Sequence, residues 1–506
     1  MEKRLFLAIA LALLVLLSWS AFVSKTYHID NKAVTLESPV PTTVKPVVSE
    51  LSQIRPQELS VLSLLKLPQE KYDVVFTESQ AAIKEVIFKS YQNYTFPLQY
   101  GLLLEDANLI FQKESMTPES VKFVYRDKDK QIIKRFIFYN SSYNIELELE
   151  VQNLSSLPLN INLPLVLGVL SLSGDQTQAR LKDVTFASKD KIMHLNPRKD
   201  IVFPDTKFLG LRDRYFCAII EPGSDIYSSF IKKINPQEYE VGLSAKEVML
   251  APNQKMQYKF NIYLGPQELR VIKNINPEWS AIMHYGTFDF IAQLLLQLLD
   301  FIFGLVHNWG ITIIILSLLI YLLLYPFTAK QMRSMKQMQA LQPRIEELRK
   351  IYKDSPQKLN TETMGLYREY KINPLSGCLP LILQMPIFFA LYQVLLRSVA
   401  LKGAKFLWIK DLSLPDRLFT LPAPLLFLGN EINLLPILMT IGMFIQQKFS
   451  MSATSASSAE QQKLMMIIFP LMFGFIFYHM PSGLVLYWFI NSTLMLLYQL
   501  RVSRQK

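Results

Sequence analysis

Few residues in the apolar stretches of this chain could do chemistry, and none of them is acidic. The polar or amphipathic ones are Ser317, Tyr321, Gln384, Gln393, Gln446, Gln447, Trp488 and Asn491, with Arg397 and His479 near the ends of their stretches. Without an intramembrane carboxylate, coupling to protons or cations is not expected. A phosphate-binding loop, a nucleophile with its base and a cysteine–histidine cluster are also missing from the sequence. We therefore expect neither an enzyme nor a bound metal or cofactor.

The elements that carry these residues are apolar runs suited to a hydrocarbon layer of ~30 Å. Five of them lie at residues 309–327, 379–396, 434–449, 464–480 and 483–500, and the third is short enough that it could begin earlier, near Leu425. A further run at residues 5–23 follows Lys3 and Arg4 and predicts a membrane anchor over residues 1–24. Ser18-Trp19-Ser20 offers a cleavage pattern, but the apolar run continues beyond it. Residues 25–59 are expected to form a linker.

The distribution of charge predicts how these spans are oriented. Residues 1–306 hold 33 Lys/Arg and 33 Asp/Glu, whereas residues 307–506 hold 20 and 9. The loop at residues 330–371 carries ten basic and five acidic residues, as cytoplasmic loops do. Both chain ends, including the basic tail at residues 501–506, are then cytoplasmic. Because this positive charge serves topology, we expect no direct recognition of nucleic acid.

Residues 60–280 alternate as strands do and predict an exported all-β domain. Ile145, Leu147, Leu149 and Val151 are interleaved with glutamates, and a second run from Met256 to Leu264 repeats the pattern. Such runs bury one face of a strand and leave the other in water. A sandwich follows from many such strands with turns at Pro and Gly.

The segment 283–307 changes to a helical period. Its polar residues recur at steps of three and four, so that they form a narrow stripe, namely Asp289, Gln293, Gln297, Asp300, Gly304 and His307. We interpret this segment as an amphipathic helix in the outer interface of the membrane. The alternative is a core helix of the β domain.

The cytoplasmic loop at residues 330–372 is itself predicted to be a helical hairpin. A seam containing Met332, Met335 and Met338 continues through Leu341 to Ile351, and Ser355-Pro356 starts a second helix. A methionine seam suits promiscuous apolar contact, although the two arms could equally pack on each other with it.

At several separate points the sequence resembles the YidC insertase family. The similar motifs run in order through residues 307–500: Asn308-Trp309-Gly310, Tyr325-Pro326, Leu341-Gln342-Pro343, and the runs at residues 373–380, 384–388 and 481–488. The exported β domain resembles the Gram-negative form of the family. The resemblance implies an α-helical polytopic membrane bundle, a five-span insertase core plus an N-terminal anchor, with a periplasmic all-β supersandwich domain. Residues 308–500 would form the core.

By this resemblance the protein would be a membrane protein insertase and chaperone of the bacterial inner membrane. Its partners would be nascent membrane proteins, the ribosome, the Sec translocon, the signal recognition particle receptor and membrane lipids. In the family, the spans enclose a polar groove open to the cytosol and to lipid. A small-molecule transporter and an assembly factor for membrane complexes remain the alternative functions.

The resemblance also assigns residues. The polar groove would contain Ser317, Tyr321, Gln384, Gln447, Trp488 and Asn491. The slide for the incoming helix would contain Met385, Phe388, Phe389, Met472 and Phe475, and the recruitment hairpin Met332, Met335, Met338, Arg344, Arg349 and Lys350. One position departs from the family, because Tyr321 stands where an arginine is usual. Neither Arg397 nor Lys448 lies at a depth and place that would obviously replace it.

Overall fold

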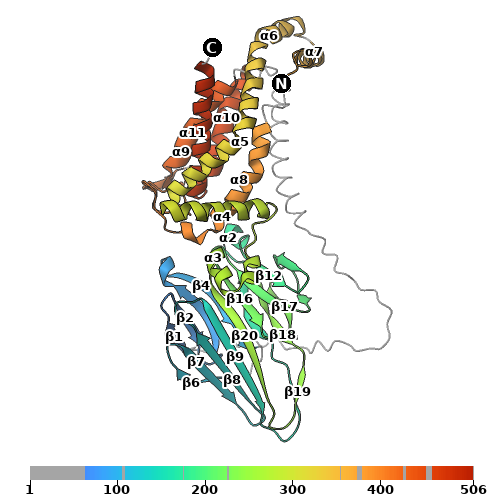
Figure 1. The fold of residues 1–506 in the computed structure, drawn as a ribbon, viewed down its shortest axis with the longest axis vertical. Helices are drawn as coiled ribbons and strands as arrows, with labels where there is room; N and C mark the ends of the chain where they lie inside the picture. Colours follow the sequence, from blue (N-terminus) through green and yellow to red (C-terminus); the bar gives the residue numbers. More distant parts are fainter. Residues whose placement is uncertain are drawn as a thin grey trace, which may run out of the picture.

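The computed structural model describes residues 63–104, 109–174, 176–224, 227–353, 355–372, 379–425, 429–451 and 459–504. The anchor and linker expected at residues 1–59 lie outside the described residues, as do Cys378 and the end of the basic tail. The described chain has a β domain at one end and a helical bundle at the other (Figure 1).

One antiparallel sheet dominates the β domain. Its nine strands lie in the order β13 (Ile192–Leu195), β12 (Asp183–Ala187), β15 (Phe208–Arg212), β16 (Phe216–Pro222), β20 (Lys255–Pro266), β9 (Asn144–Asn153), β8 (Lys130–Phe138), β7 (Ser120–Arg126) and β6 (Gln112–Met116). The predicted alternation is confirmed in β9, where Ile145, Leu147, Leu149 and Val151 are buried and the glutamates between them are not.

Smaller sheets cover the buried face of this large sheet. They are β1 (Leu64–Pro68), β2 (Tyr72–Thr77), β3 (Ala82–Phe88) and β4 (Tyr94–Gly101); β14 (Ile201–Phe203), β17 (Tyr227–Asn235), β18 (Glu238–Ala245), β11 (Leu165–Ser171) and β5 (Leu103–Leu104); and the pair β10 (Leu159–Ile161) and β19 (Val248–Leu250). Aromatic rings join the layers: Phe88 stacks on Phe216 with centroids 4.1 Å apart, and Phe76 contacts Phe136 at 5.1 Å. The result is the expected β sandwich.

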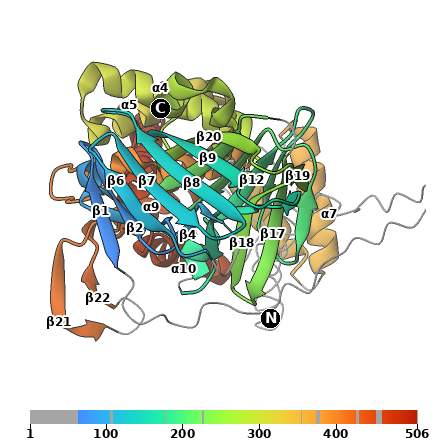
Figure 2. The ribbon, with the colours of Figure 1, turned by 90° about the horizontal axis from the view of Figure 1, so that it is seen from below.

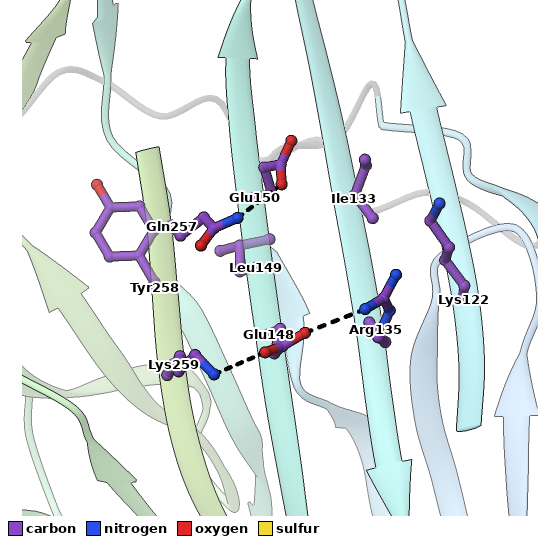
Figure 3. Close-up of a pocket in the computed structure, with 9 residues that line it drawn as sticks. All are labelled: Lys122, Ile133, Arg135, Glu148, Leu149, Glu150, Gln257, Tyr258 and Lys259. Carbon is purple, nitrogen blue, oxygen red and sulfur yellow. Dashed lines mark hydrogen bonds and ion pairs between the residues drawn. The ribbon is translucent and has the colours of Figure 1, made fainter. Parts of the chain in front are cut away.

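The outer face of the large sheet is a ladder of paired charges around a small pocket. Glu148 lies between Arg135, at 3.5 Å, and Lys259, at 2.8 Å (Figure 3). Lys255 pairs with Glu150 at 3.0 Å. Cross-strand pairs of opposite charge stabilise a solvated sheet face modestly. These glutamates therefore serve the sheet, as the strand pattern predicts.

A short helical connection leads from the sandwich to the bundle: α3 (Leu269–Ile275), a 3-10 turn η2 (Pro277–Ile282) and α4 (Asp289–Val306). Two further short helical segments, η1 (Lys89–Tyr91) and α2 (Gln176–Ala179), lie within the β domain. Figure 1 shows α4 lying across the end of the bundle, roughly perpendicular to the long helices. Ala292, Leu295, Leu299 and Ile302 of α4 are buried, whereas Phe290, Leu294, Phe301 and Leu305 are exposed. One face thus packs on the bundle and another remains uncovered and apolar.

The bundle consists of α5 (Trp309–Ala340), α8 (Leu379–Arg397), α9 (Leu434–Met451), α10 (Ala459–Tyr478) and α11 (Ser482–Arg504). By length and composition, segments of α4, α5 and α11 could each cross a membrane, and α8 and α10 contain shorter apolar segments. Because α4 packs mainly on α5 and α8, it is not a core helix of the β domain, which was the alternative interpretation. At the end away from the β domain lie α6 (Gln342–Ile351), α7 (Pro356–Glu369) and the last described residues of α11 (Figure 1).

Two elements differ from the sequence predictions. The first arm of the hairpin expected at residues 330–372 is not a separate helix, because α5 continues without a break to Ala340 and the chain turns at Leu341, before Gln342-Pro343. The apolar run before residue 434 does not extend the third span either. It forms a strand pair instead, β21 (Phe419–Leu425) with β22 (Gly429–Ile432), and Gly429 at the start of β22 has a φ of 76°, which a right-handed helix cannot contain.

The β domain is held on the outer ends of the bundle by basic side chains. Arg214 donates to the carbonyl oxygens of Leu396 (2.8 Å) and Ser413 (3.1 Å). Arg397, the last residue of α8, donates to the carbonyl of Leu181 at 3.0 Å, and Lys402 lies over the ring of Tyr94 at 4.2 Å. These contacts place Arg397 and Lys402 at the junction between the bundle and the β domain.

A buried ion pair stiffens the same junction. Arg212 binds both carboxylate oxygens of Asp183, at 2.5 and 2.7 Å, and also donates to the carbonyls of Ile282 and His284. Burial alone would raise the pKa of Asp183, but the guanidinium of Arg212 holds it below its ordinary value. The chain leading into α4 is therefore fixed to the sandwich by a charge-assisted, bidentate contact.

Candidate functional site

The candidate site begins with two stripes of polar residues on neighbouring helices. On α5, Ser317, Tyr321 and Tyr325 follow one another at steps of four, and α11 carries Tyr487, Asn491 and Tyr498. Residues four apart share a helix face, and α5 and α11 pack against each other. Both helices begin at the end near the β domain, so the stripes run in the same direction. We call these six residues the polar seam.

At its outer end the seam is closed. Ser317 is fully buried, and its hydroxyl donates to the carbonyl of Ile313 at 2.7 Å, one turn earlier in α5. A hydroxyl satisfied by its own helix costs little in an apolar environment. Ser317 therefore places a hydroxyl inside the bundle, and in this conformation that hydroxyl donates only to a carbonyl of α5.

In the middle of the seam three residues, Gln384, Tyr487 and Asn491, are joined by hydrogen bonds, and we call them the node. The amide of Gln384, on α8, donates to the hydroxyl of Tyr487. Asn491 donates to the carbonyl of Tyr487 at 3.1 Å. The node joins α8 to α11, and Tyr487 at its centre is fully buried. Tyr487 is not among the predicted site residues, although it lies one turn before Asn491 on the same face.

The inner end of the seam is lined by tyrosine rings. Tyr321 and Tyr325 meet edge to face with centroids 6.4 Å apart, and Tyr325 meets Tyr498 at 5.4 Å. Tyr321 is half-buried and Tyr325 is 43% exposed. Neither stripe of the seam contains a charged side chain. At position 321, where the resemblance led us to expect an arginine, the structure has an aromatic ring with a hydroxyl.

Beside the node lies an aromatic cluster of Phe388, Phe473, Phe477 and Trp488. The ring of Trp488 lies 5.2 Å from Phe388, 5.7 Å from Phe473 and 5.4 Å from Phe477. The cluster brings together α8, α10 and α11. Phe388 and Trp488 are predicted site residues, whereas Phe473 and Phe477 are not, although their spacing of four puts them on one face of α10.

The other predicted slide residues are dispersed. Phe475 is 54% exposed on the surface of α10, and Met472 and Met385 are half-buried. Phe389 turns towards the start of α4, where its ring lies parallel to that of Phe288 at 6.4 Å. Gln447, assigned to the groove, is half-buried on α9 and is not part of the seam.

The methionines of the hairpin form a second, separate cluster. Met332, Met335 and Met338, at the inner end of α5, are buried together with Leu341, Ile345, Tyr367 and Ile372, and Tyr498 of the seam packs against them. In this conformation the methionines are buried by packing of the inner end of α5 against α6 and α7. Arg344 donates to the hydroxyl of Tyr370, while Arg349 and Lys350 occupy the last turn of α6.

A glycine in the first motif has a steric reason. A Cβ atom on Gly310 would lie 2.1 Å from the ring of Phe406, which comes from the loop after α8. The outer end of α5 therefore needs glycine for this ring to pack. Among the described residues no group of three or more His, Cys, Asp or Glu could hold a metal ion.

Comparison with known proteins follows the same division of the chain. The family described as 60Kd inner membrane protein matches residues 301–506, and the YidC periplasmic domain matches residues 77–298. The membrane protein insertase YidC of Pelobacter propionicus is 30% identical over 100% of this chain and 99% of its own length. That of Syntrophobacter fumaroxidans is 35% identical over 74% of this chain and 68% of its own length. A crystal structure of an active YidC insertase covers 88% of this chain and 94% of its own, with 19% identity and a TM-score of 0.43.

Proposed function

Because the chain belongs to the YidC family of membrane protein insertases, multi-pass inner membrane proteins with a periplasmic domain, we propose how its own residues perform insertion. The translocated polar segment of a nascent membrane protein passes along the polar seam, and its apolar segment leaves between α8 and α10 into lipid. The seam is polar but uncharged in this protein. Insertion then relies on hydrogen bonding and apolar burial rather than on attraction to a fixed positive charge.

The observation that carries the proposal is the node of Gln384, Tyr487 and Asn491. An unpaired polar group in hydrocarbon costs several kcal/mol, so a helix bundle keeps such groups only where they are used. The amides and hydroxyls of this node and the tyrosines below it can exchange their internal bonds for bonds to a passing backbone. Each exchange lowers the cost of moving a polar segment through the bundle.

The driving force needs no nucleotide. Burying an apolar segment of ~20 residues in lipid is favourable by roughly 25 cal/mol per Å² of apolar surface. Trp488 and its aromatic neighbours offer a matching surface for that segment at the side of the node. A polar path beside an apolar exit thus separates the two parts of a substrate.

The orientation proposed from the charge pattern has both termini in the cytoplasm. The hairpin of α6 and α7 and the inner ends of α5 and α11 would then face the ribosome, while the β domain faces the periplasm. Arg344, Arg349 and Lys350 would meet the ribosome or the signal recognition particle receptor. The Sec translocon would share substrates with the bundle laterally.

An insertion assay with paired substrates tests the uncharged seam. Two otherwise identical nascent proteins, one with an acidic translocated tail and one with a neutral tail, are inserted into vesicles containing the protein. We expect the wild type to insert the two substrates with yields within about twofold of each other. In Tyr321→Arg, the yield of the substrate with the acidic tail should be several-fold higher than that of the substrate with the neutral tail. Tyr321→Phe, which keeps the ring and adds no charge, is the matched control. A strong preference of the wild type for the acidic tail that Tyr321→Arg leaves unchanged would refute the uncharged-seam proposal.

A further inference from the structure

The strand pair β21–β22 is an apolar projection that neither the spans nor the seam uses. Between Arg417 and Glu431 the sequence contains no charged residue. Phe419 is 53% exposed, and its neighbours Thr420, Pro422 and Ala423 are exposed too. Figure 2 shows the pair extending sideways from the molecule, beyond the outlines of the β domain and the bundle. Within the described chain, the two strands contact each other extensively and no other strand or helix to that degree.

The root of this projection is held rigidly at the outer end of the bundle. Arg417 and Glu431 form an ion pair at 2.9 Å across the two strands. The hydroxyl of Tyr478, at the end of α10, donates to the carbonyl of Glu431 at 2.7 Å. Asn433 donates to the carbonyl of Tyr478 at 2.8 Å. The direction in which the strands leave the bundle is therefore fixed by the protein.

The side chains at the root suit the level of lipid headgroups. Asp416 accepts from the indole of Trp408 at 3.2 Å and from the backbone of Leu435, the second residue of α9, at 2.6 Å. Tryptophan and tyrosine concentrate at membrane–water interfaces, because one end of each ring is apolar and the other is polar. Tyr478 is the last residue of α10, and Trp408, in the loop after α8, is joined through Asp416 to the start of α9.

From these observations we propose that β21–β22 lies in the outer leaflet of the membrane, parallel to its plane, and binds lipid. The strand pair leads directly into α9, on which the apolar side chains of Ile437 and Ile441 are also exposed. Its apolar side chains would be unfavourable in water. Its two-stranded ribbon still has unpaired backbone groups at both edges, so the interface suits it better than the hydrocarbon core.

The prolines favour lipid over a second polypeptide as the occupant. Pairing of β21 and β22 is regular at Phe419 and Thr420 and resumes only at Leu425. Pro422 and Pro424 lie in the interrupted part and have no N–H to donate. They remove donors that an added strand would need, and they reduce the number of unpaired donors brought into lipid.

Spin-label accessibility tests the proposal in the full chain, reconstituted in vesicles of phosphatidylethanolamine and phosphatidylglycerol. A nitroxide is placed by Phe419→Cys in a Cys378→Ser background, since Cys217 is fully buried. Leu323→Cys on α5 serves as the lipid control and Met249→Cys on β19 as the water control; both native residues are 70% exposed. Collision rates are measured with oxygen, which enters lipid, and with a nickel chelate, which stays in water.

We expect the label at residue 419 to resemble the lipid control, with a several-fold higher oxygen-to-nickel ratio than at residue 249. A nickel accessibility equal to that of residue 249 would place the strands in water and overturn the proposal. A label shielded from both reagents would mean that a protein covers the strands, which also overturns it. Thr420→Cys repeats the measurement on the neighbouring exposed residue and keeps the test independent of one substitution.

Discussion

At the level of single residues, the site depends on hydrogen bonds that the sequence alone could not pair. Gln384, Asn491 and Trp488 are predicted from the sequence, because polar or amphipathic side chains cost free energy inside a span and are therefore usually functional there. Tyr487, which joins two of them, was missed because a tyrosine beside a tryptophan reads as ordinary packing. Pairing Gln384 with Tyr487 requires knowing which faces of α8 and α11 meet, and that depends on residues 103 positions apart.

The Gln384–Tyr487 bond predicts a non-additive pair of substitutions. Tyr487→Phe leaves the amide of Gln384 without its acceptor and should destabilise the bundle by about 0.6–2 kcal/mol, with a matching loss of insertion. Gln384→Leu combined with Tyr487→Phe removes both partners and should recover part of the stability but not the insertion. Thermal unfolding in detergent and an insertion assay separate the two effects. Simple additivity of stability would contradict the bond.

Lys134 in the β domain predicts a pH dependence. It is fully buried and donates to the carbonyls of Ala81 (2.6 Å) and Leu102 (2.5 Å), and burial lowers the pKa of Lys134 to about 7. Between about pH 7 and 9 the unfolded chain therefore holds a proton that the folded chain has lost, so stability should rise with pH. The slope should approach ~1.4 kcal/mol per pH unit.

Thermal unfolding of the full chain between pH 7 and 9 measures this slope, and Lys134→Met should flatten it. Lys130→Met, a nearby lysine outside the core, is the control and should leave the slope unchanged. An equal slope in the wild type and in Lys134→Met would show that the buried amine does not lose its proton in this range.

At the level of elements, period and composition predicted most of the fold, and helix ends were the weak point. Strand β9 and helix α4 could be located from the sequence, because burial of one face imposes a period of two on a strand and of 3.6 on a helix. The continuation of α5 to Ala340 was missed because amphipathic and membrane-spanning stretches of one helix have different compositions but the same backbone. The strand pair before α9 was missed because an apolar run has no period that distinguishes a span from strands.

The packing of the hairpin predicts which residues release it. Ile345 is 1% exposed within the methionine cluster, whereas Ile351, in the same helix α6, is 70% exposed. Ile345→Ala should cost roughly 2–5 kcal/mol of local packing and detach α6 and α7 from the end of α5. Limited trypsin digestion should then cut at Arg344, Arg349 or Lys350 much faster. Ile351→Ala should digest as the wild type does; equal digestion of both variants would contradict the cluster.

At the level of the whole molecule, the β domain and the bundle behave as one docked unit. The contacts at the junction could not be predicted from the sequence pattern of either domain. By that pattern Arg214 would be a solvated residue at the end of a strand, and its role depends on α8 lying beside it. Arg397 reads as a snorkelling residue for the same reason. The docking fixes the outer end of α8, the helix that also contains Gln384 and Phe388.

Removing the guanidinium of Arg214 should loosen this docking. In Arg214→Gln, distances between spin labels at residue 249 of the β domain and residue 323 of α5 should broaden markedly, because two buried carbonyl contacts are lost. Arg270→Gln, in which a 69%-exposed arginine loses its 3.7 Å contact to Asp300, should leave the distribution narrow. An unchanged distribution in Arg214→Gln would show that other contacts dock the domain.

The measurement that tests the account most directly is photocrosslinking of nascent chains from single positions in the bundle. A photoreactive residue is placed at residue 321 in the polar seam, at residue 488 in the aromatic cluster, and at residue 323, whose leucine is 70% exposed on the same helix. We predict that the polar translocated segment of a ribosome-bound membrane protein crosslinks at residue 321 and its apolar segment at residue 488, with little product at residue 323. Equal products at residues 321 and 323, or none at residues 321 and 488, would contradict passage along the seam.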